Sequence, residues 1–261
     1  MKKFLTFIIL TTIFTSCIPN KDLIYFQGEP SEANTLQKLQ NEPYKLQVND
    51  MLDLQIKSPD KKLVALFQTS TPGTDNSLRY TNENIYFTAY SIDRQGNIRL
   101  PYIGEINVLG YTTTEVREKI EKKFAVYFKN PEDIFITVKL AGIRFTVLGE
   151  VKSTGSKVLY LNQVNLVEAL ATAGDITITG NRSNVTIFRK NLDGTKRYKV
   201  NMLDISSFDS DNFFIQSNDV IYVEPLKQKS WGTGTSGMQT ITSLIAVLSL
   251  VTTTILLINA L

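Results

Sequence analysis

The chain carries two apolar stretches without charge, one near each end, and a patterned middle lies between them. The first stretch covers residues 4–14, follows a basic start and precedes two small residues. A membrane-spanning helix needs about 20 apolar residues, so this shorter core predicts a secretory signal peptide over residues 1–16. The second stretch covers residues 238–261, with no charged side chain after Lys229. At about 1.5 Å per residue it can cross a hydrocarbon core of about 30 Å, so it predicts a transmembrane helix.

Alternation of apolar and polar residues predicts short strands in the first part of the middle. It runs over residues 46–48 and 52–56, which indicates two half-buried strands joined by a turn at Asn49-Asp50. Residues 134–140 alternate in the same way. Between these strands the sequence predicts one helix, because the spacing of Thr112 and Glu115 is typical of the capping box at a helix N-terminus. Val116, Ile120 and Phe124 share one face of that helix, and Asn130-Pro131 ends it.

A second unit follows from Gly142. Asn165 and Glu168 form another capping box, and Gly174 is the expected C-terminal stop of that helix. The dipeptide Asp193-Gly194 predicts a hairpin over residues 184–200. Further strands are predicted at residues 143–151, 153–161 and 217–225. This order fits a small sheet that grips one helix, as in a β-grasp domain.

Composition excludes several classes of function. The chain has no histidine, so it has no His-based catalytic triad and no His metal site. The formal net charge of +3 is too small to indicate binding of nucleic acid. We expect no metal and no cofactor.

No group of residues in the sequence matches the residue types and spacing of a catalytic site better than chance would. Asp50, Asp193, Asp204 and Asp219 each lie beside turn residues, where an aspartate caps or bonds the backbone. The glycines of the second unit lack phosphate-loop spacing and are interpreted as positions that need a positive φ. The 11 Tyr and 14 Phe residues offer rings for stacking on sugars, but most alternate in strands, which favours core packing. The sequence therefore predicts that the protein is not an enzyme.

The only cysteine, Cys17, stands where cleavage of the signal is expected. The stretch "IFTSC" resembles a bacterial lipoprotein signal, in which this cysteine is acylated and becomes the first mature residue. The alternative is a plain secretory signal with an incidental cysteine. More than one acyl chain is needed for stable anchoring, so a diacylated or triacylated Cys17 would hold the protein at a membrane.

The two middle units together resemble the outer-membrane polysaccharide export proteins, which pass capsule or exopolysaccharide out of Gram-negative cells. The resemblance rests on "YKLQVNDMLDLQI", "IDRQGNIRLPYIGEINVLGYTTTEV" and "NPEDIFITV". The segments "VLGEVKSTGSKVLYL", "NLVEALATAGDIT" and "SNDVIYVEP" look like the soluble-ligand-binding β-grasp (SLBB) domain that follows in this family. Asn49 stands where the family usually has glycine.

The resemblance assigns signature positions and a domain order. The export-domain signature comprises Asp50, Gly96, Pro101, Gly104, Gly110 and Pro131, and the β-grasp turns comprise Gly149, Gly155, Gly174 and Asp219. The fold class is α+β, with a small mixed-sheet export domain, then a β-grasp domain, then the C-terminal transmembrane helix. The expected boundaries are 1–16 signal peptide, 17–42 tether, 43–140 export domain, 141–226 β-grasp domain, 227–237 linker and 238–261 transmembrane helix.

The resemblance also implies an assembly. It implies a homo-oligomeric ring, with an octamer as the expected size, that encloses a periplasmic cavity for polysaccharide in transit. It further implies docking to an inner-membrane polysaccharide copolymerase and tyrosine-kinase-type protein. The protein is then lipid-anchored in the outer membrane, with most of the chain in the periplasm. In such rings the last helices of all subunits form a barrel through the outer membrane.

The last helix has two distinct faces. One is wholly apolar, whereas the other is small and hydroxylated, which suits close helix packing or a wet lumen. The candidate pore or helix-seam residues are Thr242, Ala246, Ser249 and Thr253. The helix pattern alone leaves open whether this is a pore helix or a lone anchor whose threonines bond their own backbone; the resemblance favours the pore.

Two other functions remain as alternatives to a translocon component. One is a doubly anchored periplasmic binding module, in which the β-grasp domain captures a small ligand or cell-wall glycan. The other, which has the least support, is a glycan-processing enzyme. Oligomer size separates the first alternative from a ring, and turnover of the exported polymer would reveal the second.

Overall fold

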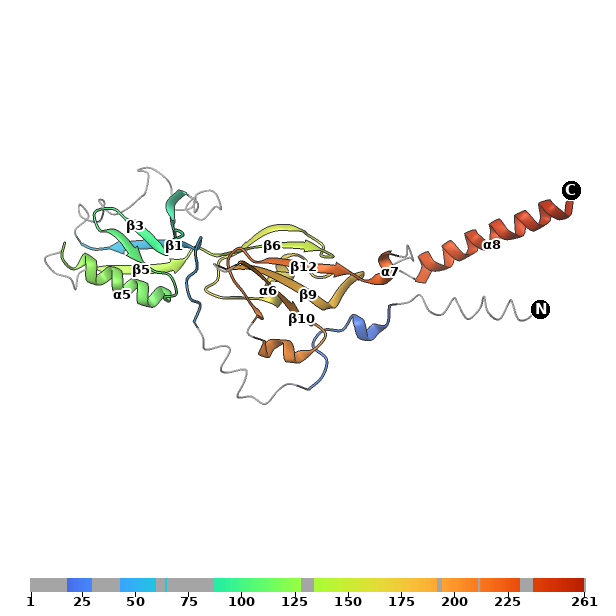
Figure 1. Cartoon of the computed structure of the whole chain (residues 1–261), viewed down its shortest axis with the longest axis horizontal. Coiled ribbons are helices and arrows are strands. Elements are labelled where there is room, and N and C mark those ends of the chain that lie inside the picture. The colour runs from blue at the N-terminus through green and yellow to red at the C-terminus, as the bar shows by residue number, and fades with distance from the viewer. Residues whose placement is uncertain are drawn as a thin grey trace.

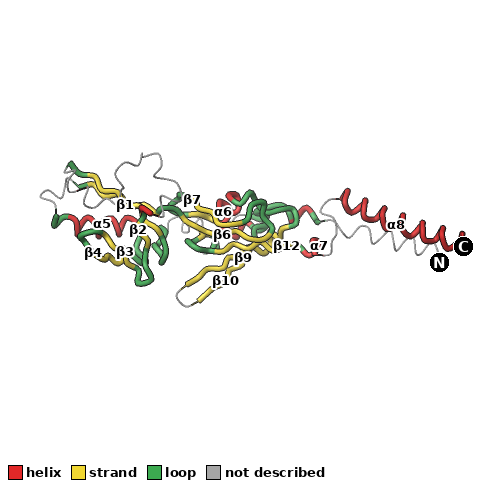
Figure 2. The backbone as a smooth tube through the Cα atoms, turned by 90° about the horizontal axis from the view of Figure 1, so that it is seen from above, coloured by secondary structure: helices red, strands yellow, loops and turns green. Residues whose placement is uncertain are grey.

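The structure is a computed structural model, and it describes residues 18–29, 43–59, 64, 87–127, 134–191, 194–210, 212–230 and 237–260. The described parts follow one another along a long axis (Figure 1): a small α+β unit, a larger unit built on a five-stranded sheet, and helix α8 (Gly237–Ala260). The same order is seen after a rotation of 90° (Figure 2). The combination of helices and sheets confirms the α+β class. The mixed sheet predicted for the first unit is wrong, because all of its described strand pairs are antiparallel; the second unit has the mixed sheet.

The first unit holds a three-stranded antiparallel sheet in the order β2–β1–β5. The strands are β1 (Met51–Lys57), β2 (Tyr90–Ser91) and β5 (Phe135–Leu140). A separate hairpin joins β3 (Asn97–Leu100) to β4 (Gly104–Asn107). Leu52 and Ile56 of β1 lie opposite Leu140 and Ile136 of β5, and all four are buried. The predicted alternation over residues 52–56 and 134–140 thus forms the core-facing side of this sheet.

Helix α5 (Thr113–Phe124) packs against this sheet through the predicted face, since Val116, Ile120 and Phe124 are buried. Its capping box is present: the Glu115 N–H donates to Oγ1 of Thr112 at 3.2 Å, and the Thr112 N–H donates to Oε2 of Glu115 at 2.7 Å. The helix ends at Phe124. The predicted stop at Asn130-Pro131 lies outside the described residues.

The predicted strand at residues 46–48 does not form. Only residue 46 pairs with another segment: the Leu46 N–H donates to the Tyr111 carbonyl at 3.0 Å, and the Gly110 N–H donates to the Leu46 carbonyl at 2.9 Å. Leu46 is fully buried. The alternation therefore reflects burial of one side chain against a loop, because no strand among the described residues continues the ladder there.

The second unit is a five-stranded sheet in the order β10–β9–β12–β6–β7. Its strands are β6 (Ile143–Gly149), β7 (Gly155–Leu159), β9 (Gly180–Asn191), β10 (Gly194–Val200) and β12 (Val220–Pro225). All neighbours are antiparallel except β12 and β6, which run parallel, with Val220 opposite Thr146. The hairpin predicted at Asp193-Gly194 forms, with Gly194 opposite Asn191, although Asp193 itself lies outside the described residues.

Smaller elements complete this unit. Helix α6 (Leu166–Thr172) begins with the predicted capping box of Asn165 and Glu168 and buries Leu166, Ala169 and Leu170. A two-stranded ladder pairs β8 (Val164–Asn165) with β11 (Phe214–Ile215), and a short 3-10 helix, η5, covers Ile205–Asp209.

Residues 18–29, which sequence reasoning assigns to a polar tether, pack against the second unit. They include a short 3-10 helix, η2 (Asn20–Asp22). The Phe26 ring centroid lies 4.7 Å from that of Phe208, and the Tyr25 hydroxyl donates to Oδ1 of Asp175 at 2.5 Å. This stretch is therefore a docked segment, because its aromatic side chains find partners on the sheet unit.

The C-terminal part begins with the short helix α7 (Lys227–Ser230). The Lys229 ammonium lies 2.5 Å from Oε1 of Glu150, which joins α7 to the end of β6. The structure describes the backbone of α8 over Gly237–Ala260 and the side chains of residues 242, 245–253, 256 and 257. Within the residues described in this way, no helix is both long and apolar enough to span a membrane.

Candidate functional site

The first signature residue, Asp50, lies buried in the turn before β1. Its carboxylate accepts hydrogen bonds from the Tyr44 hydroxyl at 3.0 Å and from the Gln47 N–H at 2.7 Å. Asn49, where the resemblance leads us to expect a glycine, has a φ of 69°. Asparagine tolerates this left-handed conformation better than most residues, so the turn keeps the shape that glycine would give it.

Asp50 also connects the two units. Burial raises the pKa of its carboxyl above the ordinary 3.8, and hydrogen bonds from the Ser217 side chain, the Gln47 backbone and Tyr44 oppose that shift. Ser217 belongs to the loop before β12 in the second unit. Asp50 therefore has a structural role, because it links the turn before β1 to the loop before β12.

This raised pKa predicts a pH dependence of stability. The folded state binds the Asp50 proton more tightly than the unfolded state does, so protonation of Asp50 stabilises the fold. This contribution to the free energy of unfolding is complete below pH 3.8 and is lost as pH rises through the folded pKa. Between pH 4 and pH 7, we expect the wild-type protein to lose more thermal stability than Asp50→Asn. Thermal melts at both values measure this, with Glu118→Gln as an exposed control. An identical loss in wild type and Asp50→Asn would contradict the assignment.

The other signature residues of the first unit frame the β3–β4 hairpin. Gly96 has a φ of 83°, and a Cβ at this position would lie 2.5 Å from the Cβ of Leu109, so two turns meet here without room for a side chain. Pro101 lies in the turn between the strands, and Gly104 and Gly110 both have positive φ. Pro131 is outside the described residues. These residues shape the chain and do not converge on a reactive centre.

The β-grasp turn glycines also have the predicted positive φ: 89° at Gly149, 118° at Gly155 and 77° at Gly174. Gly149 has a steric reason as well, since a Cβ there would lie 2.1 Å from the Val223 carbonyl oxygen. At this point β6 and β12 approach too closely for any other residue.

Asp219 does more than bond its own turn. Its carboxylate accepts the Gln216 N–H at 2.9 Å, as predicted, but it also binds Arg189 of β9, with Nη2 at 2.8 Å and Nε at 3.0 Å. The side chains are 0% and 9% exposed, so this is a buried ion pair. A further donation from Arg189, to the Phe214 carbonyl at 2.9 Å, secures the loop before β12. The Asp204 carboxylate, by contrast, caps η5 by accepting the Ser206 N–H at 2.9 Å.

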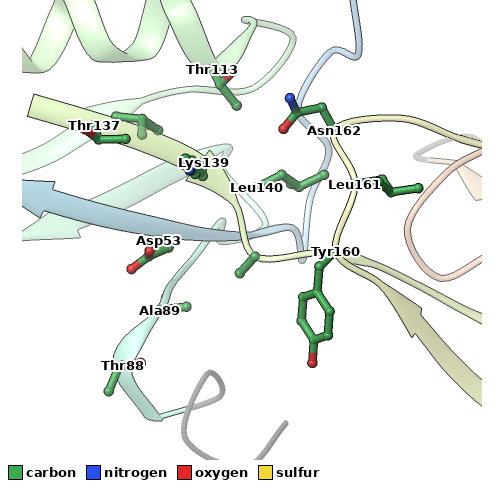
Figure 3. A pocket seen from close by; sticks show the side chains of 12 residues that line it. Asp53, Thr88, Ala89, Thr113, Thr137, Lys139, Leu140, Tyr160, Leu161 and Asn162 are labelled. Atoms are coloured by element: carbon green, nitrogen blue, oxygen red, sulfur yellow. The ribbon is translucent and has the colours of Figure 1, made fainter. Parts of the chain in front are cut away.

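A cleft of about 730 Å³ lies where the two units meet. Figure 3 shows Asp53, Thr88 and Ala89 on one side and Tyr160, Leu161 and Asn162 on the loop after β7. Lys139 of β5 also lines this cleft and lies opposite Asp53 in the strand register. The cleft thus presents one carboxylate, one ammonium, several hydroxyls, an amide and a half-exposed ring. These groups suit contact with sugar hydroxyls or with another protein surface. No two of them form a nucleophile–base pair. Among the described residues there is no cluster of three metal-ligating side chains.

The candidate face of α8 is exposed in the single chain, at Thr242, Ala246, Ser249 and Thr253. The Thr253 hydroxyl donates to the Ser249 carbonyl at 2.7 Å, and the Thr252 hydroxyl donates to the Leu248 carbonyl at 2.9 Å. Hydroxyls that bond their own helix are the geometry expected of a lone anchor. The same hydroxyls can also rotate toward water or a neighbouring helix.

Sequence comparisons match both units to described families. Residues 38–141 match the family described as polysaccharide biosynthesis/export protein, and residues 143–223 match the SLBB domain. The chain is similar to the EPS I polysaccharide export outer membrane protein EpsA of Ralstonia nicotianae, with 30% identity over 70% of the chain. It is 29% identical to the EpsA protein of Ralstonia solanacearum, also over 70% of its length. It spans about half the length of these relatives, 47% and 48% respectively.

Proposed function

The chain belongs to the polysaccharide export family, with an SLBB domain after the export domain, and we propose that it exports an extracellular or capsular polysaccharide across the outer membrane. The observation that carries this proposal is the order of the two matches, which run consecutively from residue 38 to residue 223. The names of the two EpsA relatives support the outer membrane as the location. The family is a transport family, and we propose no catalytic role.

The proposed assembly is a lipid-anchored homo-oligomeric ring, with domains at residues 43–140 and 141–226. Its anchors would be an acylated Cys17, which lies outside the described residues, and the uncharged helix over residues 238–261. The polymer would pass through the ring, and an inner-membrane polysaccharide copolymerase would supply it.

The places where the chain leaves the second unit support two anchors in one membrane. Tyr25 contacts Asp175, and two residues further on the Thr177 hydroxyl donates to Glu150, the partner of Lys229. Both the N-terminal segment and α7 therefore leave the second unit at one end, opposite the export domain (Figure 1).

A second candidate function is the doubly anchored binding module, and the backbone-bonded hydroxyls of Thr252 and Thr253 favour it. Loss of the chain tests the export function directly: surface polymer should disappear and polymer should remain inside the cell. If surface polymer is unchanged in the absence of the chain, the export function is wrong.

Oligomer size separates the two candidates. We expect the full chain, extracted in mild detergent, to form a closed particle many times heavier than the 29.4 kDa chain. Mass photometry or native mass spectrometry measures this size. A stable monomer would contradict the ring and favour the binding module.

Thiol labelling tests whether the last helix lines water. With Cys17 acylated, single cysteines at Ser249 and Thr253 should react with a membrane-impermeant reagent, whereas cysteines at Leu248 and Val251 should stay protected by lipid. A charge at Val251 should also cost insertion about 2.5–3.5 kcal/mol, because lipid cannot solvate it. Uniform protection at all four positions would indicate an anchor without a wet lumen.

A further inference from the structure

A second cleft between the two units, of about 650 Å³, is lined by cations and amides but by no carboxylate. Its polar lining includes Asn49, Arg94, Arg189, Lys190, Asn191 and Gln216. The first unit contributes the side from Leu46 to Gly110, and the second unit contributes the rest. The cleft thus brings Arg94 of one unit and Lys190 of the other to one cavity.

Charge distinguishes this cleft from two others among the described residues. The cleft of Figure 3 contains both Asp53 and Lys139, and a shallow one beside η2 contains Lys21 with two aspartates. In the cationic cleft, Arg189 is already neutralised by Asp219. That leaves Arg94 and Lys190, both exposed, and neither forms an ion pair with any described residue.

The remaining polar groups of the wall are amides and a hydroxyl. Asn49, Asn191 and Gln216 can each donate and accept, which suits the hydroxyls of a sugar ring. A guanidinium and an ammonium prefer an anionic oxygen pair, and Arg binds a carboxylate through two parallel hydrogen bonds. A ligand that satisfies the whole wall therefore carries both hydroxyls and a carboxylate.

We propose that this cleft binds an acidic sugar residue, such as a uronic acid, of the polysaccharide in transit. The proposal rests on the proposed export function and adds the charge of the substrate to it. Because the two cations come from different units, an occupied cleft also bridges the export domain and the SLBB domain.

The experiment measures binding of two oligosaccharides to the full-length protein in detergent by isothermal titration calorimetry. Tetragalacturonate should bind at low salt, and neutral maltotetraose should bind at least tenfold more weakly. The variant Arg94→Gln/Lys190→Gln should lose at least tenfold in tetragalacturonate affinity. The control variant Lys57→Gln/Arg99→Gln removes the same charge from exposed positions outside the cleft and should bind as wild type does. Thermal melts check that both variants fold.

Three outcomes would overturn the proposal. Equal affinity for the acidic and neutral tetrasaccharides would remove the role of charge. Unchanged binding by the Arg94→Gln/Lys190→Gln variant would place the ligand elsewhere. Inorganic phosphate and monomeric galacturonate can each be added as competitors of tetragalacturonate. If phosphate competes at the same concentration as galacturonate, the cleft is a general anion site without sugar recognition. Failure of the export function is a separate result, because it is measured as surface polymer in cells.

Discussion

Removal of residues 238–261 should abolish surface display of the polysaccharide while its synthesis inside the cell continues. The two sheet units bury their own cores, including Phe145, Ile187 and Val223 in the second, so the remaining body should stay folded and soluble. If the last helices of all subunits form the passage through the membrane, no path remains for the polymer. Antibody staining of intact cells measures surface polymer, and extraction of lysed cells measures the total.

A matched variant separates a pore from an anchor. It replaces residues 238–261 with an unrelated transmembrane helix of the same length, which restores attachment without the hydroxylated face of Thr242, Ala246, Ser249 and Thr253. We expect this variant to reach the outer membrane and still fail to export. Normal surface polymer from either variant would mean that the native helix has no role in the passage.

Asp219→Ala should destabilise the second unit by about 3–5 kcal/mol, the range for a buried ion pair that loses one partner. The change leaves the Arg189 guanidinium buried without its counter-charge, and it also removes the acceptor of the Gln216 N–H. Urea unfolding of the body without residues 238–261 measures the loss as a shift of the midpoint. Less than about 1 kcal/mol would show that water or a rearranged loop compensates Arg189.

Two comparisons control this prediction. The partly exposed pair of Arg117 and Glu121 on α5 is 3.0 Å apart, and Glu121→Ala should cost only about 0.3–0.5 kcal/mol. The double change Arg189→Met/Asp219→Leu removes both charges and replaces them with apolar volume. It should be far less destabilising than Asp219→Ala alone, because no unpaired charge remains.

The parts of the fold that sequence reasoning predicts best depend on short-range chemistry. Helix α5 follows from its capping box and its apolar spacing, and the β9–β10 hairpin follows from one turn dipeptide. The positive φ of Gly149 and Gly174 is also predictable, because few other residues occupy that region. Each of these signals is contained within about a dozen residues.

The missed features all depend on partners far along the chain. Asp219 has a sufficient local explanation in its turn, so nothing nearby points to Arg189, which is 30 residues away. The docking of Tyr25 depends on Asp175, 150 residues later, and its neighbourhood has the polar composition of a linker. The predicted strand at residues 46–48 fails for the converse reason, since a strand needs a neighbour and sequence alternation does not supply one. The cationic cleft combines loops from both units, and no single stretch reveals it.

The parallel pairing of β6 with β12 determines when the second unit can complete its fold. The hairpins β6–β7 and β9–β10 are local and can form while the chain is still emerging, but β12 must arrive before it can join β6 to β9. Until Val220 reaches Thr146, two strands present unpaired edges, which are templates for pairing with another chain. The nascent protein is therefore most prone to aggregation before residues 220–225 have left the ribosome. A truncated chain that lacks these residues would remain prone to aggregation permanently.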